Sequence, residues 1–115
     1  MELLKLDEEL VQAIIPQKIW EIKLLTDDAK RLLATLMYHW DKFEEVKTSG
    51  CLTIGNLDLY KGLGWAKNSR SNRRLLNAVA LLEIYKLVKR IPGEKWKKGE
   101  DKKASEYYVN WDIIN

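Results

Sequence analysis

The sequence has few of the residues on which covalent and metal chemistry depend. It contains one cysteine, Cys51, and one histidine, His39. A single cysteine excludes an intramolecular disulfide, and the two residues together cannot supply the four ligands of a structural zinc site. We therefore expect Cys51 to be a plain core or sheet-edge residue in a reducing cytoplasm. His39 is expected to be a packed or surface residue rather than a ligand.

Long apolar runs and phosphate-binding loops are also absent. No stretch of 18 apolar residues occurs, and the acidic N-terminus lacks the basic start and apolar stretch of a signal peptide. Gly62 and Gly64 are not followed by the lysine and serine that a phosphate-binding loop needs. The acidic pairs Asp27-Asp28 and Glu44-Glu45 are explained by the helix dipole and by solvation. We expect a cytoplasmic protein with no membrane partner, no cofactor, no metal and no enzyme activity.

The composition that remains is typical of one folded domain. The chain has 115 residues, of which 46% are apolar and 32% are charged. A chain of this length usually forms a single hydrophobic core, and this apolar content argues against disorder. Eleven aromatic side chains, five of them Trp, are enough to fill that core. We expect four of the tryptophans to be core residues: Trp20, Trp40, Trp65 and Trp111.

The N-terminal half is predicted to be mainly helical. Residues 6–13 have the pattern of a short helix or strand that stops at Pro16, because proline lacks an N–H and disfavours helix before it. A long helix is predicted from Thr26, whose hydroxyl can cap the free N–H groups of the first turn, to about Val46. Its apolar positions recur at helical spacing and make it the central core helix: Ala29, Leu32, Leu33, Leu36, Met37, Trp40 and Phe43.

The C-terminal half is predicted to be mixed. A brief extended segment at 51–54 precedes a short helix over 57–63, capped by Asn56 and closed by Gly64. After a turn, a third helix runs from a cap at Ser69 or Ser71 to about Tyr85. A strand over 87–91, a Lys-rich loop and an alternating strand over 105–112 complete a hairpin with an extended tip.

Positive charge is concentrated in one third of the chain. Residues 66–103 hold twelve Lys or Arg against four acids, a charge of +8. The rest holds eight basic and thirteen acidic residues, a charge of −5, which gives the net +3. Such an asymmetry within one small domain indicates a polyanionic partner. The two densest pieces are the helix start SRSNRR and the loop GEKWKKGEDKK.

Two segments carry a resemblance to a known fold family. The stretch LDLYKGLGW (57–65) resembles the positioning helix of winged helix-turn-helix domains, and VALLEIYKLVKR (79–90) resembles the run from recognition helix into the first wing strand. The chain departs from the family at Lys86, where glycine is usual, and in a longer turn between the helices. The resemblance covers about 25–113. It implies an α+β fold with a three-helix core, a small antiparallel sheet and a long basic wing.

The segment upstream is similar to something narrower. Ile14-Ile15-Pro16, Trp20 and LLTDDAKRLL (24–33) are similar to the start of winged-helix domains in plasmid and phage replication proteins. Such domains occur as stand-alone initiators and as terminal DNA-binding domains of primase-helicases. The resemblance implies one domain over 1–115, with an extension at 1–25, a helical core at 26–85 and a wing hairpin at 86–113.

The resemblance also implies how each basic residue is used on double-stranded DNA. The third helix would enter the major groove N-terminal end first, where Arg can bond guanine and Asn can bond adenine through two hydrogen bonds. Lysines are mobile point charges that suit phosphates. The residues implied as base readers are Arg73, Arg74 and Asn77. The residues implied as phosphate contacts are Lys67, Ser69, Arg70, Ser71, Asn72, Lys95, Lys97, Lys98, Lys102 and Lys103.

The sequence allows more than one role for Trp96 and for the domain as a whole. Trp96 can insert in the minor groove, pack on a sugar or stack on an unpaired base, or it can fold back on the sheet. Origin binding in plasmid or viral replication is the first hypothesis, and transcription regulation with the same fold is its rival. Two hypotheses of a different class are binding of RNA or single strands and docking of an acidic protein. A homodimer or the other domains of a larger replication protein are further possible partners.

Overall fold

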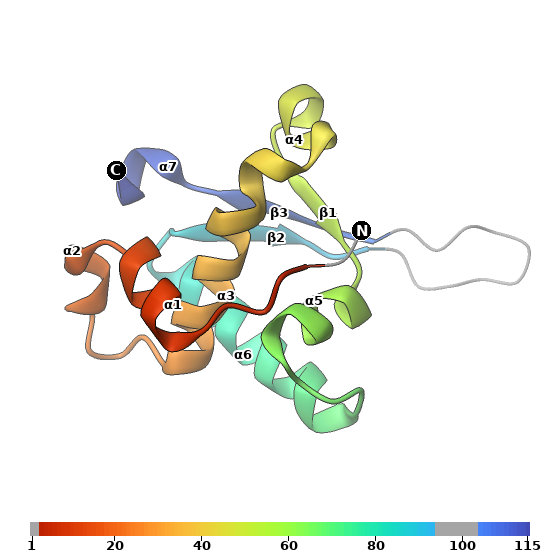
Figure 1. Ribbon diagram of the computed structural model, residues 1–115, viewed down its shortest axis with the longest axis horizontal. Coiled ribbons are helices and arrows are strands. Elements are labelled where there is room, and N and C mark those ends of the chain that lie inside the picture. Colours follow the sequence, from red (N-terminus) through yellow and green to blue (C-terminus); the bar gives the residue numbers. More distant parts are fainter. Residues whose placement is uncertain (1–2, 94–103) are drawn as a thin grey trace, which may run out of the picture.

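A three-stranded antiparallel sheet, with the strand order β1-β3-β2, lies against a layer of helices (Figure 1). This computed structural model describes residues 3–93 and 104–115. The described residues form seven α-helices, one 3-10 helix and three strands, so the predicted α+β class is confirmed. In chain order the elements are α1 (Glu8–Ile14), α2 (Gln17–Trp20), α3 (Asp27–His39), η1 (Trp40–Lys42), α4 (Glu44–Ser49), β1 (Leu52–Ile54), α5 (Asn56–Leu63), α6 (Ser69–Ile84), β2 (Val88–Ile91), β3 (Ser105–Val109) and α7 (Trp111–Ile114).

The N-terminal segment belongs to the same hydrophobic core as the rest of the chain. Helix α1 begins where the Asp7 carboxylate accepts a hydrogen bond from Leu10 N–H at 2.8 Å, which satisfies one of the free donors of the first turn. The helix ends just before Pro16, as the sequence predicts. The segment before α3 contributes six buried apolar side chains to the core: Leu3, Leu6, Val11, Ile15, Ile19 and Leu25.

The central core helix is shorter than the predicted helix from Thr26 to Val46. Thr26 caps it as expected, because its Oγ1 accepts a hydrogen bond from Ala29 N–H at 3.2 Å. The prediction of its end was wrong: α3 stops at His39, and the chain passes through η1 to a separate helix, α4. Phe43 marks the break, with extended backbone (φ −108°, ψ 122°) and a buried side chain. Packing of Phe43 in the core therefore outweighs the helical periodicity of the sequence.

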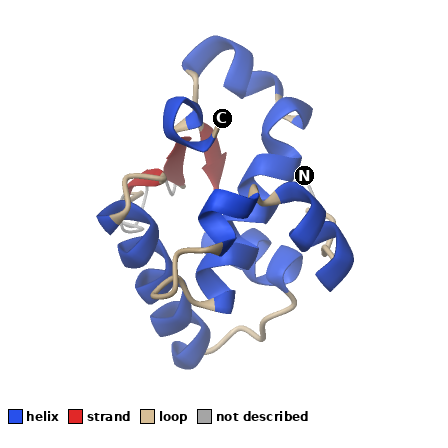
Figure 2. Ribbon diagram, turned by 90° about the vertical axis from the view of Figure 1, so that its left-hand side faces the viewer, coloured by secondary structure: helices blue, strands red, loops and turns tan. Residues whose placement is uncertain are grey.

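Helix α3 lies at the centre of the helical layer and contacts α1, α5 and α6. Helix α5 begins one residue earlier than predicted, because Gly55 rather than Asn56 occupies the cap position. It ends at Gly64 as predicted, with a left-handed φ of +76° that glycine adopts without strain. Figure 2 shows the strands gathered in one small sheet with the helices around it.

The sheet joins the predicted hairpin to the brief extended segment. Strands β2 and β3 pair antiparallel with Val88 opposite Val109, and β1 pairs with the other side of β3 through Leu52 and Tyr107. These four side chains are buried, and burial alternates along β3 as the sequence predicts. Just before β2, Lys86 has a left-handed φ of 59°. A residue with a Cβ pays a steric cost in this conformation, which glycine avoids.

The last predicted strand, over 105–112, was three residues too long. It ends at Val109, because Asn110 turns the chain: its N–H donates to the carbonyl of Leu87 at 2.9 Å, and its Nδ2 donates to the carbonyl of Lys86 at 3.0 Å. The following residues form α7. Trp111 there packs edge-to-face on Trp40, with ring centroids 5.9 Å apart. The segment is therefore a short helix that contacts a distant part of the chain, where the alternation of the sequence predicts a strand.

The residues that we expected to be structural are packed as expected. Cys51 and His39 are buried, and four tryptophans are half-buried against the core: Trp20, Trp40, Trp65 and Trp111. Within the two described ranges, no helix is long and apolar enough to cross a bilayer.

Candidate nucleic-acid interface

Helix α6 has a buried face and an exposed face. Its buried side chains are Ser71, Leu75, Ala78, Val79 and Leu82, and the helix contacts α3 and β2. Five of the predicted contact residues are exposed on the other side: Ser69, Arg70, Asn72, Arg73 and Asn77. Ser69, Arg73 and Asn77 are spaced by four residues, so they form one row over the first turns. This row of hydrogen-bond donors is directed away from the core and is free to meet another molecule.

The first turn of α6 is capped by a residue that we did not predict. Asn68, rather than Ser69 or Ser71, occupies the cap position, and its Oδ1 accepts a hydrogen bond from Ser71 N–H at 2.9 Å. Asn ranks with Ser as a cap, so the preference for these residue types does not by itself decide between Asn68 and Ser69. Ser71 is buried, and its hydroxyl donates to the carbonyl of Ala66. The prediction that Ser71 contacts phosphate is therefore corrected: Ser71 joins the helix to its preceding turn.

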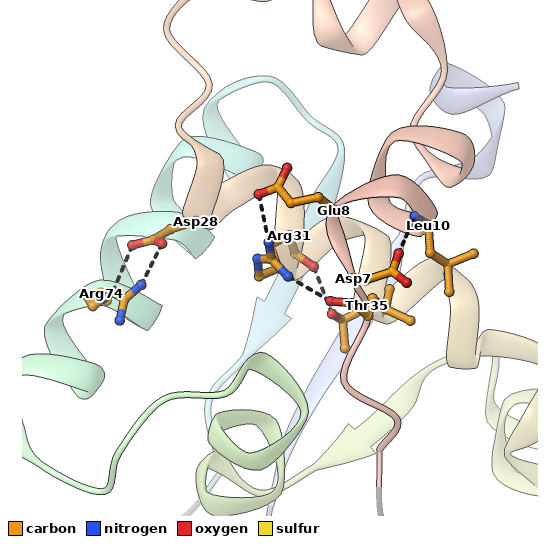
Figure 3. Close-up of polar contacts among 8 residues, drawn as sticks. Asp7, Glu8, Leu10, Asp28, Arg31, Thr35 and Arg74 are labelled. Carbon is orange, nitrogen blue, oxygen red and sulfur yellow. Dashed lines mark hydrogen bonds and ion pairs between the residues drawn. The ribbon is translucent and has the colours of Figure 1, made fainter.

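Arg74 is half-buried and paired with an acid of another helix, in contrast to the exposed arginines Arg70 and Arg73 of α6. Its Nε and Nη2 donate to the two carboxylate oxygens of Asp28 at 3.0 and 2.8 Å (Figure 3). Its guanidinium also lies 4.0 Å from the ring centroid of Trp65. The hydrogen bonds to Asp28 raise the pKa of Arg74 above its ordinary value. In this structure Arg74 ties α6 to the first turn of α3, and its role as a base reader stays a prediction.

The turn between α5 and α6 presents a further predicted residue. It runs over 64–68, and Lys67 is exposed within it. Backbone hydrogen bonds fix the start of the turn, since Trp65 N–H donates to the carbonyl of Tyr60 at 2.8 Å. The Trp65 ring packs beside that of Tyr60, with centroids 6.4 Å apart. Lys67 therefore sits on a turn that is itself held by the core.

The base of the β2–β3 hairpin is fixed by Arg90. Its Nε donates to the hydroxyl of Tyr107 at 3.1 Å, and its Nη2 donates to Ser105 Oγ at 3.0 Å. Gly93 N–H also donates to Ser105 Oγ, at 3.1 Å. Burial raises the pKa of Tyr107 above its ordinary value. The sequence indicates only that Arg90 adds to the positive charge. In the structure Arg90 links β2 to β3 through Ser105 and Tyr107.

The remaining predicted contact residues are in that loop. Residues 94–103 lie outside the described part of the chain, and with them lie the predictions for Lys95, Trp96, Lys97, Lys98, Lys102 and Lys103. Among the residues that the structure does describe, six predicted contact residues are exposed and make up the candidate interface: Lys67, Ser69, Arg70, Asn72, Arg73 and Asn77.

Elsewhere on the described surface, we find no arrangement of side chains that indicates a metal site or a catalytic site. In the ranges 3–93 and 104–115, no group of three or more His, Cys, Asp or Glu side chains is arranged to hold a metal. An open groove of about 520 Å³ lies between the end of α6 and the sheet, lined by residues that include Glu83, Lys89 and Tyr108. The groove brings together no nucleophile with a base.

Comparisons with known proteins do not identify a family for this chain. No family model, curated protein or solved structure gives a significant match to it. The functional conclusion therefore depends on the geometry and chemistry of the chain itself.

Proposed function

We propose that this chain is a winged helix-turn-helix protein that binds double-stranded DNA, with α6 in the major groove and the β2–β3 hairpin as a wing on the backbone. The observation that carries the proposal is the exposed row of Arg73, Asn77 and Ser69 on the N-terminal half of a rigid helix. These residues are held away from the core by a buried face of Leu75, Ala78, Val79 and Leu82. A major groove admits one helix and displays a distinct pattern of donors and acceptors for each base pair.

The order of the elements supports the fold named in this proposal. In the family, a helix, a short strand, two helices joined by a turn and a wing hairpin follow one another, which corresponds to α3, β1, α5, α6, β2 and β3. Lys86 adds a local argument. The family usually has glycine at this place, and Lys86 has the left-handed φ that favours glycine. At this position the chain therefore differs from the family in residue type, while its backbone has the conformation that glycine favours.

The chemistry of the exposed residues divides them into two roles. Arg73 and Asn77 project from the helix surface, and both can form paired hydrogen bonds with a base edge. Ser69, Arg70 and Asn72 are on the first turn, where the free N–H groups and the helix dipole favour phosphate oxygens. Lys67, one residue before the cap, supplies a further charge for the backbone. We assign base reading to the first pair and positioning to the others.

The lysines of the loop are proposed to add affinity with little specificity. Each phosphate neutralised by a lysine releases counterions, so binding weakens as salt rises. Changing Lys97 and Lys98 to Ala should weaken all duplexes alike and flatten the dependence on salt. A change in sequence preference instead would contradict this division of roles.

A role in replication is the more specific part of the proposal. It rests on the similarity of residues 14–33 to the start of winged-helix domains in plasmid and phage replication proteins. An origin of replication is the DNA that such a domain would bind. A transcription regulator with the same fold is the rival, and the identity of the selected DNA site decides between them.

A titration with three nucleic acids tests the proposal. Labelled random duplex, single-stranded DNA and single-stranded RNA are titrated at four salt concentrations, and duplexes retained by the protein are sequenced. We expect duplex to bind most tightly, the affinity to fall steeply with salt, and one motif to be enriched. Preference for either single strand would favour stacking of bases on aromatic side chains instead. If no nucleic acid binds even at low salt, the proposal is wrong, and an acidic protein partner becomes the better hypothesis.

A further inference from the structure

The N-terminal segment 3–6 is seated on the two glycines at the end of α5. A Cβ atom added at Gly62 would lie 2.7 Å from Leu3 Cβ, and one added at Gly64 would lie 2.7 Å from Lys5 Cε. Real Cβ atoms do not approach other carbons this closely, so at Gly62 only glycine admits Leu3 without a shift of the segment. At Gly64 the atom met is the end of a flexible lysine side chain, and glycine is favoured there by its left-handed φ of +76°. Leu3 and Lys5 are two residues apart, so in an extended segment their side chains point to the same side. Gly62 and Gly64 thus leave room for the segment 3–6, and we call this pair of glycines the seat.

Two side chains of α3 clamp the segment in this seat. His39 Nε2 accepts a hydrogen bond from Leu4 N–H at 2.9 Å, while its Nδ1 contacts the carbonyl of Thr35 at 2.8 Å. Because Leu4 N–H must donate, Nε2 carries no proton and Nδ1 carries the hydrogen. Arg31 Nη1 donates to the carbonyl of Leu6 at 2.8 Å. Backbone groups on both sides of Lys5 are thus held by the core helix.

This arrangement places the positive charge of Lys5 beside the turn that leads into α6. Lys5 Nζ lies 3.0 Å from the position of a Cβ on Gly64, the residue that closes α5 and starts the turn. Lys61, in the last turn of α5, and Lys67, within the turn, are both exposed nearby in the chain. Among the described residues, Lys5 takes part in no ion pair. Lys5 is far in sequence from the basic third of the chain, so composition alone does not associate the two.

We propose that the segment 3–6 is part of the DNA-binding surface and that Lys5 contacts a phosphate beside the site at which α6 enters the groove. The inference rests on the proposed function. A lysine normally loses side-chain freedom when it is fixed on a phosphate. The stem of Lys5 is already laid over Gly64, so less freedom is lost on binding. Its charge adds affinity and salt dependence without reading a base.

The first test removes the charge and keeps the stem. Lys5→Gln should weaken binding of every duplex about threefold to tenfold at low salt and reduce the slope of log affinity against log salt by about one. Lys47→Gln is the matched control, because Lys47 pairs with Glu44 on α4, which lies at the opposite end of the molecule from the start of α6 (Figure 1). That control should bind like the wild type.

A second variant tests the seat rather than the charge. Gly62→Ala keeps Lys5 and favours the helix, but its Cβ displaces Leu3. We expect the same loss of affinity as in Lys5→Gln, no further loss when the two changes are combined, and faster exchange of the Leu4 amide.

The two proposals fail in different ways. If the wild type binds duplex and Lys5→Gln binds with the same affinity and salt slope, the segment is only structural and the inference is wrong, while the proposed function stands. If the wild type binds no duplex, the proposed function is wrong and the inference falls with it. Full additivity of Lys5→Gln and Gly62→Ala would show that the seat does not position Lys5, and would overturn that part of the inference.

Discussion

Arg74 and Asp28 face each other across the packed helices α6 and α3, joined by two hydrogen bonds of 3.0 and 2.8 Å. An arginine and a carboxylate held in this paired geometry resist rotation as well as separation. The ring of Trp65, 4.0 Å from the guanidinium, holds the arginine from the side of the turn. The pair therefore fixes the direction in which the N-terminal half of α6 projects, and with it the direction of Arg73.

Breaking the Arg74–Asp28 pair should destabilise the protein more than removing the neighbouring charge of Asp27. Asp28→Asn is expected to lower the free energy of unfolding by about 1 kcal/mol, a modest value because both side chains are partly exposed to solvent. Asp27→Asn is the matched control, since Asp27 has the same place in the dipole of α3 and is exposed. Urea unfolding of the three proteins measures the difference. Equal losses for both variants would show that only the helix dipole is at work.

Arg73 and Arg70 should affect DNA binding in different ways. Arg73→Ala is expected to cost roughly 1–3 kcal/mol on the preferred duplex and to relax the preference at one position, because a base contact is lost. Arg70→Ala should weaken all duplexes alike, because a phosphate contact carries no sequence information. Competition between the selected duplex and a scrambled one separates the two effects. Loss of preference in Arg70→Ala alone would reverse our assignment.

The stability of the protein should fall as the pH drops below about 6.5. Burial, opposed by the hydrogen bond to Thr35 and aided by the charge of Lys42, lowers the pKa of His39 below its ordinary value of 6.5. The unfolded chain therefore takes up a proton before the folded chain does, so stability is full above 6.5 and declines as the pH falls toward the folded pKa.

Urea unfolding between pH 7.5 and 5.5 measures this decline, and His39→Gln is the control because it leaves the chain without a histidine. The protection of the Leu4 amide, which is its exchange rate compared with that of an unfolded peptide at the same pH, should also fall at the lower pH in the wild type, since its acceptor becomes protonated. A pH dependence that is equal in both proteins would assign the effect to the carboxylates.

Replacing Lys86 with glycine should stabilise the folded protein. Its φ of 59° costs a residue with a Cβ roughly 1 kcal/mol, and part of this is recovered in Lys86→Gly after the larger entropy of the unfolded chain is subtracted. We expect a gain of about 0.5 kcal/mol in thermal or urea unfolding. Lys86→Ala keeps the Cβ and should show no gain. A gain in both variants would point to the lysine side chain rather than the backbone.

Local chemistry made much of this protein predictable. The cap at Thr26, the left-handed Gly64 and the stop before Pro16 all depend on neighbours within a few residues, and each is present where the sequence places it. The clustering of positive charge is likewise a property of the sequence. So is the exposed row of Arg73 and Asn77, because helical spacing alone separates it from the apolar stripe.

Only the tertiary structure decided what depends on contacts between distant segments. Arg73 and Arg74 are adjacent and chemically equal, but one is exposed and the other is bound to Asp28, 46 residues away. The end of α3 at His39 and the helix α7 in place of a strand depend on the burial of Phe43 and on Trp111 against Trp40. The seat of Lys5 on Gly64 is of the same kind. The sequence by itself determined which residues are able to bind a polyanion, because charge and helical period are local. The fold decided which of these residues stay exposed and unpaired, because burial and pairing depend on contacts between distant segments.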